Sequence, residues 1–265
     1  MDTIIQILAR ELGRSEAHVE NVVRLIDEGN TIPFIARYRK ELHGAMDDTA
    51  LRTLADRLQY LRNLDKRREE VKSAIEGQGK LTEELSAAID AAATLAEVED
   101  LYRPYKQKRR TRATVAREKG LEPLAELLFA QAADGPAPEE AAGAFIDPEK
   151  GVATAEDALQ GASDIIAERI SDDADIRKRL RELVWKKGSL VSAAAAKEPE
   201  DTVYRLYYAF RSPLNRVQGH QVLAINRGER EGVLKVSVEM EREAALIPVR
   251  RAVLNPGAPA MAFVR

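Results

Sequence analysis

Large apolar residues recur at intervals of three and four positions through residues 48–77. They are Leu51, Leu54, Leu58, Leu61, Leu64, Val71 and Ile75. This spacing places them on one face of an α-helix, and arginine and lysine fill the other face. Asp47 or Asp48 provides an N-cap, and Gly77-Gln78-Gly79 ends the pattern as a turn. The pattern predicts a long amphipathic helix and favours a mainly helical fold.

The composition supports this prediction. Among 265 residues, 45% are hydrophobic and 32% are charged, which is ordinary for a globular chain of one large or two small domains. Aromatic residues make up 5%, while alanine, leucine, glutamate and arginine are abundant, and this balance favours helix. The absence of cysteine excludes disulfides, thiolate metal sites and cysteine nucleophiles.

Three short helices are expected within residues 1–45. The first two apolar stripes are Ile4, Ile5, Leu8 and Leu12, then Val19, Val22, Val23 and Ile26. Gly13 suits a left-handed helix end, Ser15 can cap the second helix, and Thr31 with Pro33 opens the third. Such a trio has the outline of a helix-turn-helix-like bundle. Any small helical bundle shares that outline, so it is a weak indication of DNA binding.

Later segments continue the helical pattern and then change character near residue 190. A capping box at Thr94 and Glu97 starts a short helix, and further helices are expected at 113–119, 123–130, 139–145, 154–170, 173–187 and 220–230. Residues 193–196 and Pro199 form a weak connector before an aromatic cluster of Tyr204, Tyr207, Tyr208 and Phe210. Alternation over 233–240 predicts a strand, and the tail beyond it has no obvious partner. The expected architecture is a mainly α, multi-helical array over 1–190, followed over 191–265 by a connector, a helix, a small β element and an irregular tail.

A basic run over residues 103–119 stands out in a chain whose net charge is −3. It carries a net charge of +7, so the remainder carries −10, and such segregation raises the local potential that phosphate backbones sense. The expected phosphate contacts are Arg103, Lys106, Lys108, Arg109, Arg110 and Arg112, with Tyr102 and Tyr105 as stacking or packing partners. Pro104 and the repulsion among like charges predict an exposed segment that is not helical throughout. The alternative is a solvated face that pairs with nearby acids such as Glu97, Glu99 and Asp100.

No catalytic, metal or cofactor site is predicted. His18, His43 and His220 lie far apart in sequence without metal-ligand spacing, and no serine lies in a Gly-x-Ser-x-Gly elbow. The pairs Asp47-Asp48 and Asp172-Asp173 precede helices, where capping is the simpler role. No apolar run approaches the ~20 residues of a membrane span, and the N-terminus does not resemble a secretory signal. A cytoplasmic, non-enzymatic protein is expected.

Two longer segments carry a resemblance. TIPFIARYRKELHGAMDDTALRTL (31–54) and VEDLYRPYKQKRRTRATVAREKGLEPLA (98–125) resemble the N-terminal region of the bacterial Tex family of transcription accessory proteins, which are similar to a eukaryotic transcription elongation factor. Weaker agreement runs through 147–170 and 219–239, so the resemblance covers roughly residues 1–240. The tail from about Ala244 departs from the family pattern.

The resemblance implies a helical region that precedes an RNase H-like domain, tandem helix-hairpin-helix elements and an S1 RNA-binding domain. None of these is recognised in the sequence, so the chain is expected to be a fragment of such a protein. Truncation is expected to leave apolar strips without partners, such as Ile4, Ile5, Leu8 and Leu12 or the aromatic cluster, and so to favour a homodimer. The alternative is a self-sufficient helical domain that stays monomeric. The resemblance assigns no catalytic residue to this segment.

The leading functional hypothesis is a non-enzymatic nucleic-acid-associated module of a transcription accessory protein. It would contact RNA or DNA through the phosphate backbone, with little sequence preference. The alternative is an architectural region that braces other domains or docks on transcription machinery. A hydrolase is disfavoured, because no set of residues meets the requirements of an active site.

Overall fold

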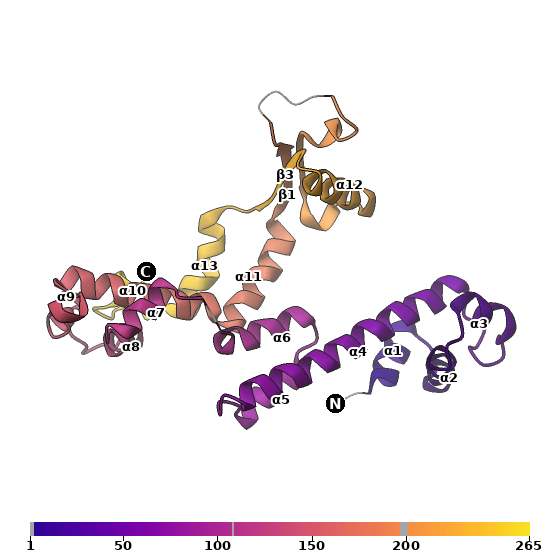
Figure 1. Ribbon diagram of the computed structural model, residues 1–265, viewed down its shortest axis with the longest axis horizontal. Coiled ribbons are helices and arrows are strands. Elements are labelled where there is room, and N and C mark those ends of the chain that lie inside the picture. Colours follow the sequence, from indigo (N-terminus) through magenta and orange to yellow (C-terminus); the bar gives the residue numbers. More distant parts are fainter. Residues whose placement is uncertain (1–2, 108, 197–200) are drawn as a thin grey trace. The chain divides into compact units, whose positions relative to one another are not determined.

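The computed structural model describes residues 3–107, 109–196 and 201–265 and divides into two compact units. Unit 1 comprises Met1–Tyr105 and unit 2 comprises Lys106–Arg265. Figure 1 labels the main elements of both units. The described part of the chain is mainly helical with one small sheet, as predicted.

Unit 1 consists of helices. They are α1 (Ile4–Leu12), α2 (Glu16–Asp27), α3 (Ile32–Tyr38), α4 (Asp48–Glu76), α5 (Glu83–Ala91), α6 (Leu95–Tyr102) and the 3-10 helix η1 (Arg103–Tyr105). The predicted long helix is α4, capped by the Asp47 side chain, and the three predicted N-terminal helices are α1–α3. Helix α5 was not predicted; it begins after a Thr82 cap and carries one buried residue, Ile89, so its apolar periodicity is weak.

The core of unit 1 is built around the apolar stripe of α4. Leu51, Leu54 and Leu64 are at most 1% exposed, and the neighbouring helices contribute further buried apolar residues to the same cluster. Leu8 of α1 is fully buried in it, and Ile4, Ile5 and Leu12 pack against it. The expectation that this strip lacks partners is therefore wrong, because α2 and α4 supply them within the same unit.

Two bidentate ion pairs join the N-terminal helices to α4. The Arg57 guanidinium donates to both carboxylate oxygens of Glu11 at 2.7 Å, and Arg62 donates to both oxygens of Asp27 at 2.7 and 2.8 Å. The hydrogen bond from Arg57 lowers the pKa of Glu11, and the hydrogen bond from Arg62 lowers the pKa of Asp27. A folded-state pKa below the unfolded one stabilises the fold above the unfolded pKa, and this stability is lost as pH falls through the folded pKa.

Replacing both acids, Glu11→Gln with Asp27→Asn, should flatten the acid dependence of stability. All four side chains are at least a third exposed, so solvent screening limits each pair to less than about 1 kcal/mol. Urea unfolding followed by far-UV circular dichroism between pH 6 and pH 3 should show a smaller loss of stability in the double variant than in the wild type. Parallel losses in the two proteins would contradict a role for these pairs.

Unit 2 begins with a helical group and continues into a sheet. Its elements are α7 (Arg112–Glu118), α8 (Glu122–Ala130), α9 (Pro138–Gly143), η2 (Pro148–Lys150), α10 (Ala155–Asp172), α11 (Ala174–Lys187), β1 (Ser189–Ala194), η3 (Arg205–Tyr207), β2 (Ala209–Pro213), η4 (Leu214–Arg216), α12 (Gly219–Arg230), β3 (Leu234–Glu239), α13 (Arg242–Val253) and α14 (Met261–Val264). The helices expected from the sequence in this region are confirmed, with ends shifted by a residue or two.

The helical core of unit 2 centres on α10, which packs against α7, α8 and α9. The closest approach is at Gly161, where a Cβ would lie 2.3 Å from Leu121 Cδ1 and 3.3 Å from Ala116 Cβ. Leu121 is 1% exposed, so its side chain has little freedom to move away. A glycine at this position allows α10 to approach α7 and the start of α8 closely.

Gly161→Ala should therefore lower the free energy of unfolding, by about 1–3 kcal/mol, the usual cost of overpacking. Gly143 of α9 is the matched control, because a Cβ added there would meet no neighbouring atom within 4 Å. Gly143→Ala should raise stability by up to about 1 kcal/mol through helix propensity. Denaturant unfolding of both variants tests this, and equal stabilisation by the two substitutions would contradict the close contact at Gly161.

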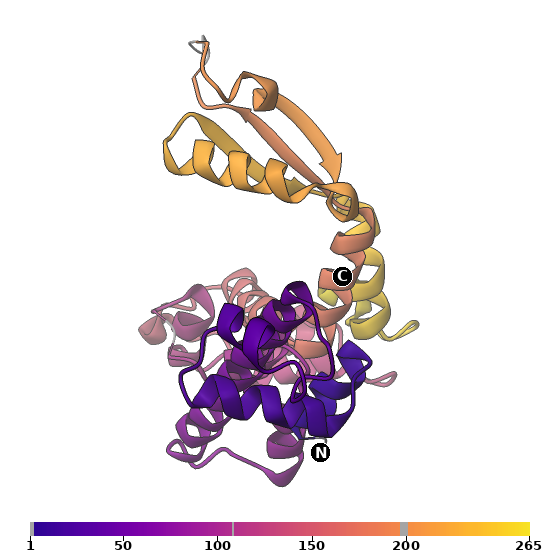
Figure 2. The same cartoon turned by 90° about the vertical axis from the view of Figure 1, so that its right-hand side faces the viewer.

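The sheet is antiparallel with strand order β2-β1-β3. The predicted strand over 233–240 is β3, but the sequence analysis missed β1 and β2. The supposed connector begins inside β1, at residues 193–194, and its Pro199 lies outside the described residues. The aromatic cluster extends into β2, with Phe210 opposite Ser192. Alanine and serine fill much of β1, so it lacks the strand signal of β-branched residues. Figure 2 shows the strands side by side with α12 along them.

The tail is not irregular, and it has a partner. Residues 242–253 form α13, and a short helix, α14, follows it. Gln131, at the end of α8, donates to the Val253 carbonyl at 2.8 Å and accepts from the Asn255 backbone N–H at 2.9 Å. The Asn255 side chain in turn donates to the Gln131 carbonyl at 2.9 Å. Since these groups are more than 120 residues apart, the sequence offered no local sign of them.

Candidate nucleic-acid interface

The residues predicted from the basic run are divided between the two units. Tyr102, Arg103 and Tyr105 end unit 1, whereas Lys106, Arg109, Arg110 and Arg112 begin unit 2. Lys108 lies outside the described residues. The predicted site therefore consists of two parts, one in each unit.

In unit 1 both tyrosines pack against the core. Tyr102 ends α6, half-buried, with the Arg67 guanidinium 5.6 Å from its ring centroid. Tyr105 lies in η1, also half-buried, and its carbonyl accepts a hydrogen bond from Gln78 Nε2 at 3.0 Å. Arg103 is exposed beside them. Both tyrosines contact the core of unit 1, and their stacking or packing against a nucleic acid stays a prediction.

In unit 2 the four cations are exposed, and helix begins only at Arg112. Arg109 has no ion pair within 4.0 Å among the described residues. The Arg110 side chain is 70% exposed and pairs with Glu118 at 2.8 Å. Arg112 is 86% exposed and lies 3.5 Å from Asp164. The expectation of an exposed, partly non-helical run is confirmed for these residues.

The helical end of the run is anchored to α10. The Thr111 side chain caps α7 by accepting from the Thr114 N–H at 3.1 Å, and it donates to Glu168 at 3.0 Å. Arg117 donates to the other oxygen of Glu168 at 2.7 Å. One carboxylate of α10 thus fixes both ends of α7, and this anchor holds the preceding cations at the surface of unit 2.

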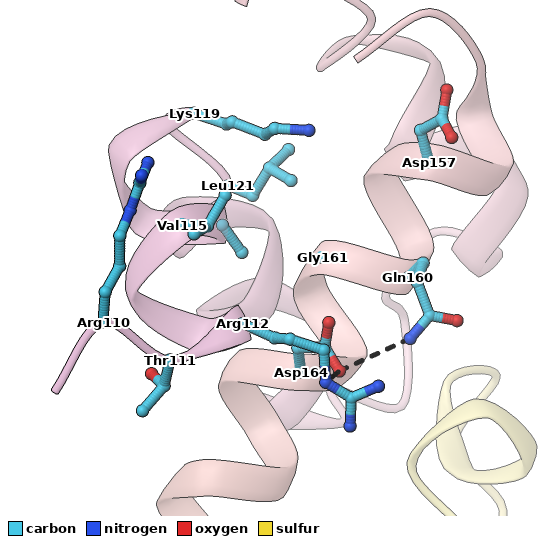
Figure 3. Close-up of a pocket in the computed structure, with 11 residues that line it drawn as sticks. Arg110, Thr111, Arg112, Val115, Lys119, Leu121, Asp157, Gln160, Gly161 and Asp164 are labelled. Atoms are coloured by element: carbon cyan, nitrogen blue, oxygen red, sulfur yellow. Dashed lines mark hydrogen bonds and ion pairs between the residues drawn. The ribbon is translucent and has the colours of Figure 1, made fainter. Parts of the chain in front are cut away.

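A pocket of about 420 Å³ lies between α7 and α10, beside this anchor (Figure 3). Arg110, Arg112 and Lys119 line it with cations, and Asp157 and Asp164 line it with acids from α10. Asp157 is occupied by the backbone N–H groups of Ala153 and Thr154, each at 3.1 Å. Both acids of the pocket therefore already have partners within the protein, Asp157 in backbone N–H groups and Asp164 in Arg112. The cations at the rim of the pocket can accept an anionic group.

A second cationic surface lies on α3 of unit 1, and the sequence analysis did not identify it as functional. Phe34 and Tyr38 are 36% and 57% exposed, and their ring centroids are 5.2 Å apart. The Arg39 guanidinium lies 5.5 Å from the Phe34 ring, and that of Arg37 lies 6.0 Å from the Tyr38 ring. Exposed aromatic rings with adjacent arginines are typical of surfaces that stack on nucleobases. The sequence signal for this surface was the alternation of basic residues with tyrosine in ARYRK.

Within residues 3–107, 109–196 and 201–265, no group of three or more histidine, aspartate or glutamate side chains is arranged to hold a metal ion. No helix in these ranges is long and apolar enough to cross a membrane.

Comparison with known proteins identifies the family. Residues 2–76 match the model of the Tex-like protein N-terminal domain, and residues 134–255 match that of the Tex central region. The chain is 49% identical over 236 residues to the uncharacterized protein YdcI of Bacillus subtilis and 41% identical over 239 residues to the transcriptional accessory protein Tex of Neisseria gonorrhoeae. It is 32% identical over 246 residues to the human S1 RNA-binding domain-containing protein 1.

These alignments cover 88%, 90% and 89% of the chain, respectively. The chain spans about a third of the length of the two bacterial relatives, 33% and 31%, and 24% of the human one. The fold and surface define a mainly helical module with exposed cations. The chain belongs to the Tex family and carries that family's N-terminal domain and central region.

Proposed function

We propose that this chain is a non-enzymatic, cytoplasmic nucleic-acid-associated module of a Tex-like transcription accessory protein. Its ligand is RNA or DNA, contacted along the phosphate backbone by the basic run. Contacts to phosphate position a nucleic acid without reading its bases, so the proposed binding has little sequence preference.

The exposure of the cations in unit 2 is the observation that supports this proposal most. Lys106, Arg109, Arg110 and Arg112 are all exposed. The pair between Arg110 and Glu118 lies in solvent, whereas Asp164, the partner of Arg112, is 16% exposed. An exposed pair is weak, so a phosphate can replace Glu118 at little cost. The names of two relatives, a transcriptional accessory protein and an S1 RNA-binding domain-containing protein, agree with a role in transcription and with an RNA ligand.

An architectural role is the second candidate, and the anchor at Glu168 favours it. Arg117 is half-buried and uses its charge within the unit, bonding to Glu168 at 2.7 Å and to Glu122 at 3.3 Å. If the remaining cations also served intramolecular packing, the module would brace other domains or dock on transcription machinery without binding nucleic acid itself.

Charge reversal separates these roles. Arg109→Glu with Arg110→Glu should weaken binding of a fluorescent single-stranded oligonucleotide at least tenfold at low salt, because about two or more phosphate contacts are lost and two repulsions are added. Thermal stability should change little, since both side chains are exposed. Fluorescence anisotropy titration measures the affinity.

Arg205→Glu with Arg230→Glu provides the matched control. Arg205 is 73% exposed and pairs with Asp201 at 3.2 Å, as Arg110 pairs with Glu118, and Arg230 is exposed like Arg109. This control makes the same change in net charge elsewhere in unit 2 and should bind within about threefold of the wild type. Equal binding by both double variants would exclude the basic run as the contact site.

A further inference from the structure

A groove of about 430 Å³ lies between α11 and α13, away from the basic run in sequence. The residues from α11 are one face of that helix, at positions 179, 182, 183, 186 and 187, and the residues from α13 are Ala244, Ile247, Pro248 and Arg251. The two helices pack against each other, although about sixty residues separate them in the chain. This convergence of charge is not visible in the sequence.

Four cations line the groove, and a single acid, Glu182, lines it with them. The cations are Arg179, Lys186, Lys187 and Arg251, all exposed. None of the four has an ion pair within 4.0 Å in the parts of the chain that the structure describes. Groups of like charge without counter-ions create a local positive potential, which attracts an anionic ligand.

The nearby acid of α13 does not neutralise this charge. Glu243 accepts a hydrogen bond from Arg250 at 2.8 Å, and neither residue lines the groove. On α11, Asp175 lies one turn before Arg179 and lines a neighbouring pocket with it, but the two form no ion pair within 4.0 Å. Glu182 and Asp175 therefore reduce the positive charge without cancelling it.

Shape and composition favour a nucleic-acid strand over a free phosphate. Arg179 and Lys186 are seven residues apart on α11, about 10 Å, so the cations extend along the groove over a length greater than one phosphate group. Leu183, Ala244, Ile247 and Pro248 give the groove an apolar floor on which sugars can pack. Trp185 does not line the groove, but it lies three residues after Glu182, just beyond the edge of the groove, and its indole is 60% exposed. An exposed indole there is a stacking surface for a base that projects from the groove.

We propose that the α11–α13 groove is a second nucleic-acid contact of this chain. Its four cations hold the sugar–phosphate backbone of a single strand, and Trp185 stacks on a base of that strand. The inference rests on the proposed function, because the ligand is the same, but it names a different surface.

Trp185 allows a direct test, since it is the one tryptophan of the chain. Adding a single-stranded oligonucleotide should quench its fluorescence, with the same midpoint as anisotropy measured on the labelled strand. Inorganic polyphosphate should compete for the groove without quenching, because it has no bases. Poly-glutamate should compete far less; competition equal to that of polyphosphate would overturn the assignment to nucleic acid.

The groove variant is Arg179→Gln, Lys186→Gln and Arg251→Gln together. It should lose the quenching and weaken binding about fivefold or more, at least the cost of one lost base stack. Trp185→Ala should weaken binding by a similar factor with the cations intact. The control, Arg205→Gln, Arg216→Gln and Arg230→Gln, removes the same charge from exposed positions that do not line the groove and should retain quenching and affinity.

The outcomes separate the two surfaces. Undiminished quenching in a groove variant whose circular dichroism matches the wild type would overturn this inference, as would binding by anisotropy without any quenching in the wild type. In either case the basic run would still be tested by the Arg109 and Arg110 variant. Loss of binding in the groove variant together with full binding in the Arg109 and Arg110 variant would support the groove and refute the basic run. No binding by the wild type would refute both.

Discussion

Each unit depends on the burial of an apolar stripe along its longest helix. In unit 1 the leucines of α4 are covered by the flanking helices, and in unit 2 Ala158, Ala162, Ile165 and Ile166 of α10 are covered by α7, α8 and α9. The two stripes differ in residue size. Large side chains on α4 set its distance from its neighbours, while the small residues of α10, above all Gly161, permit close contact with Leu121. Close packing of this kind tolerates little change in volume.

Burial of these stripes also determines where the charges lie. A cation is costly to bury without a partner, so the arginines and lysines occupy the opposite faces of the helices and the segments between them. On α4 most of these cations are bound in ion pairs, including the pairs with Glu11 and Asp27 that join helices. In unit 2 two sets lie in a different environment. At the start of the basic run Arg109 has no ion pair within 4.0 Å among the described residues and the pair between Arg110 and Glu118 is solvent-exposed. In the groove the four cations lack pairs within 4.0 Å in the same part of the chain. Arg109, Arg110 and the cations of the groove can therefore bind an external anion without breaking a buried interaction.

Much of the helical architecture could be predicted from the sequence, because a period of 3.6 residues and side-chain caps are local signals. Asp47, Thr94 and Thr154, for example, cap the N-termini of α4, α6 and α10. The strands β1 and β2 could not be predicted in this way, since serine and alanine in β1 do not alternate with large apolar residues, and pairing with β3 is what orders it. The same holds for the tail, which Gln131 binds across more than 120 residues.

For the candidate sites too, features set by neighbouring residues could be predicted from the sequence, and features set by tertiary packing could not. The cations of the basic run are adjacent in sequence, so their exposure followed from charge repulsion and Pro104. Their division between two units, and the anchoring of Thr111 and Arg117 by Glu168, depend on tertiary packing. The groove needs α11 and α13 to meet, and the aromatic pair on α3 needs one helical turn to bring Phe34 beside Tyr38. The sequence contains the residues of these surfaces but does not show that they lie close together.

The salt dependence of binding by the unmodified chain tests the central claim most directly. If exposed cations bind a phosphate backbone, each contact releases counter-ions, and log K falls by about 0.7 per contact for each unit of log salt on a single strand. With four or more contacts in unit 2, we expect a slope of about −3 or steeper, similar for strands of different sequence. A slope near zero, or no binding at low salt, would contradict the account and favour the architectural role.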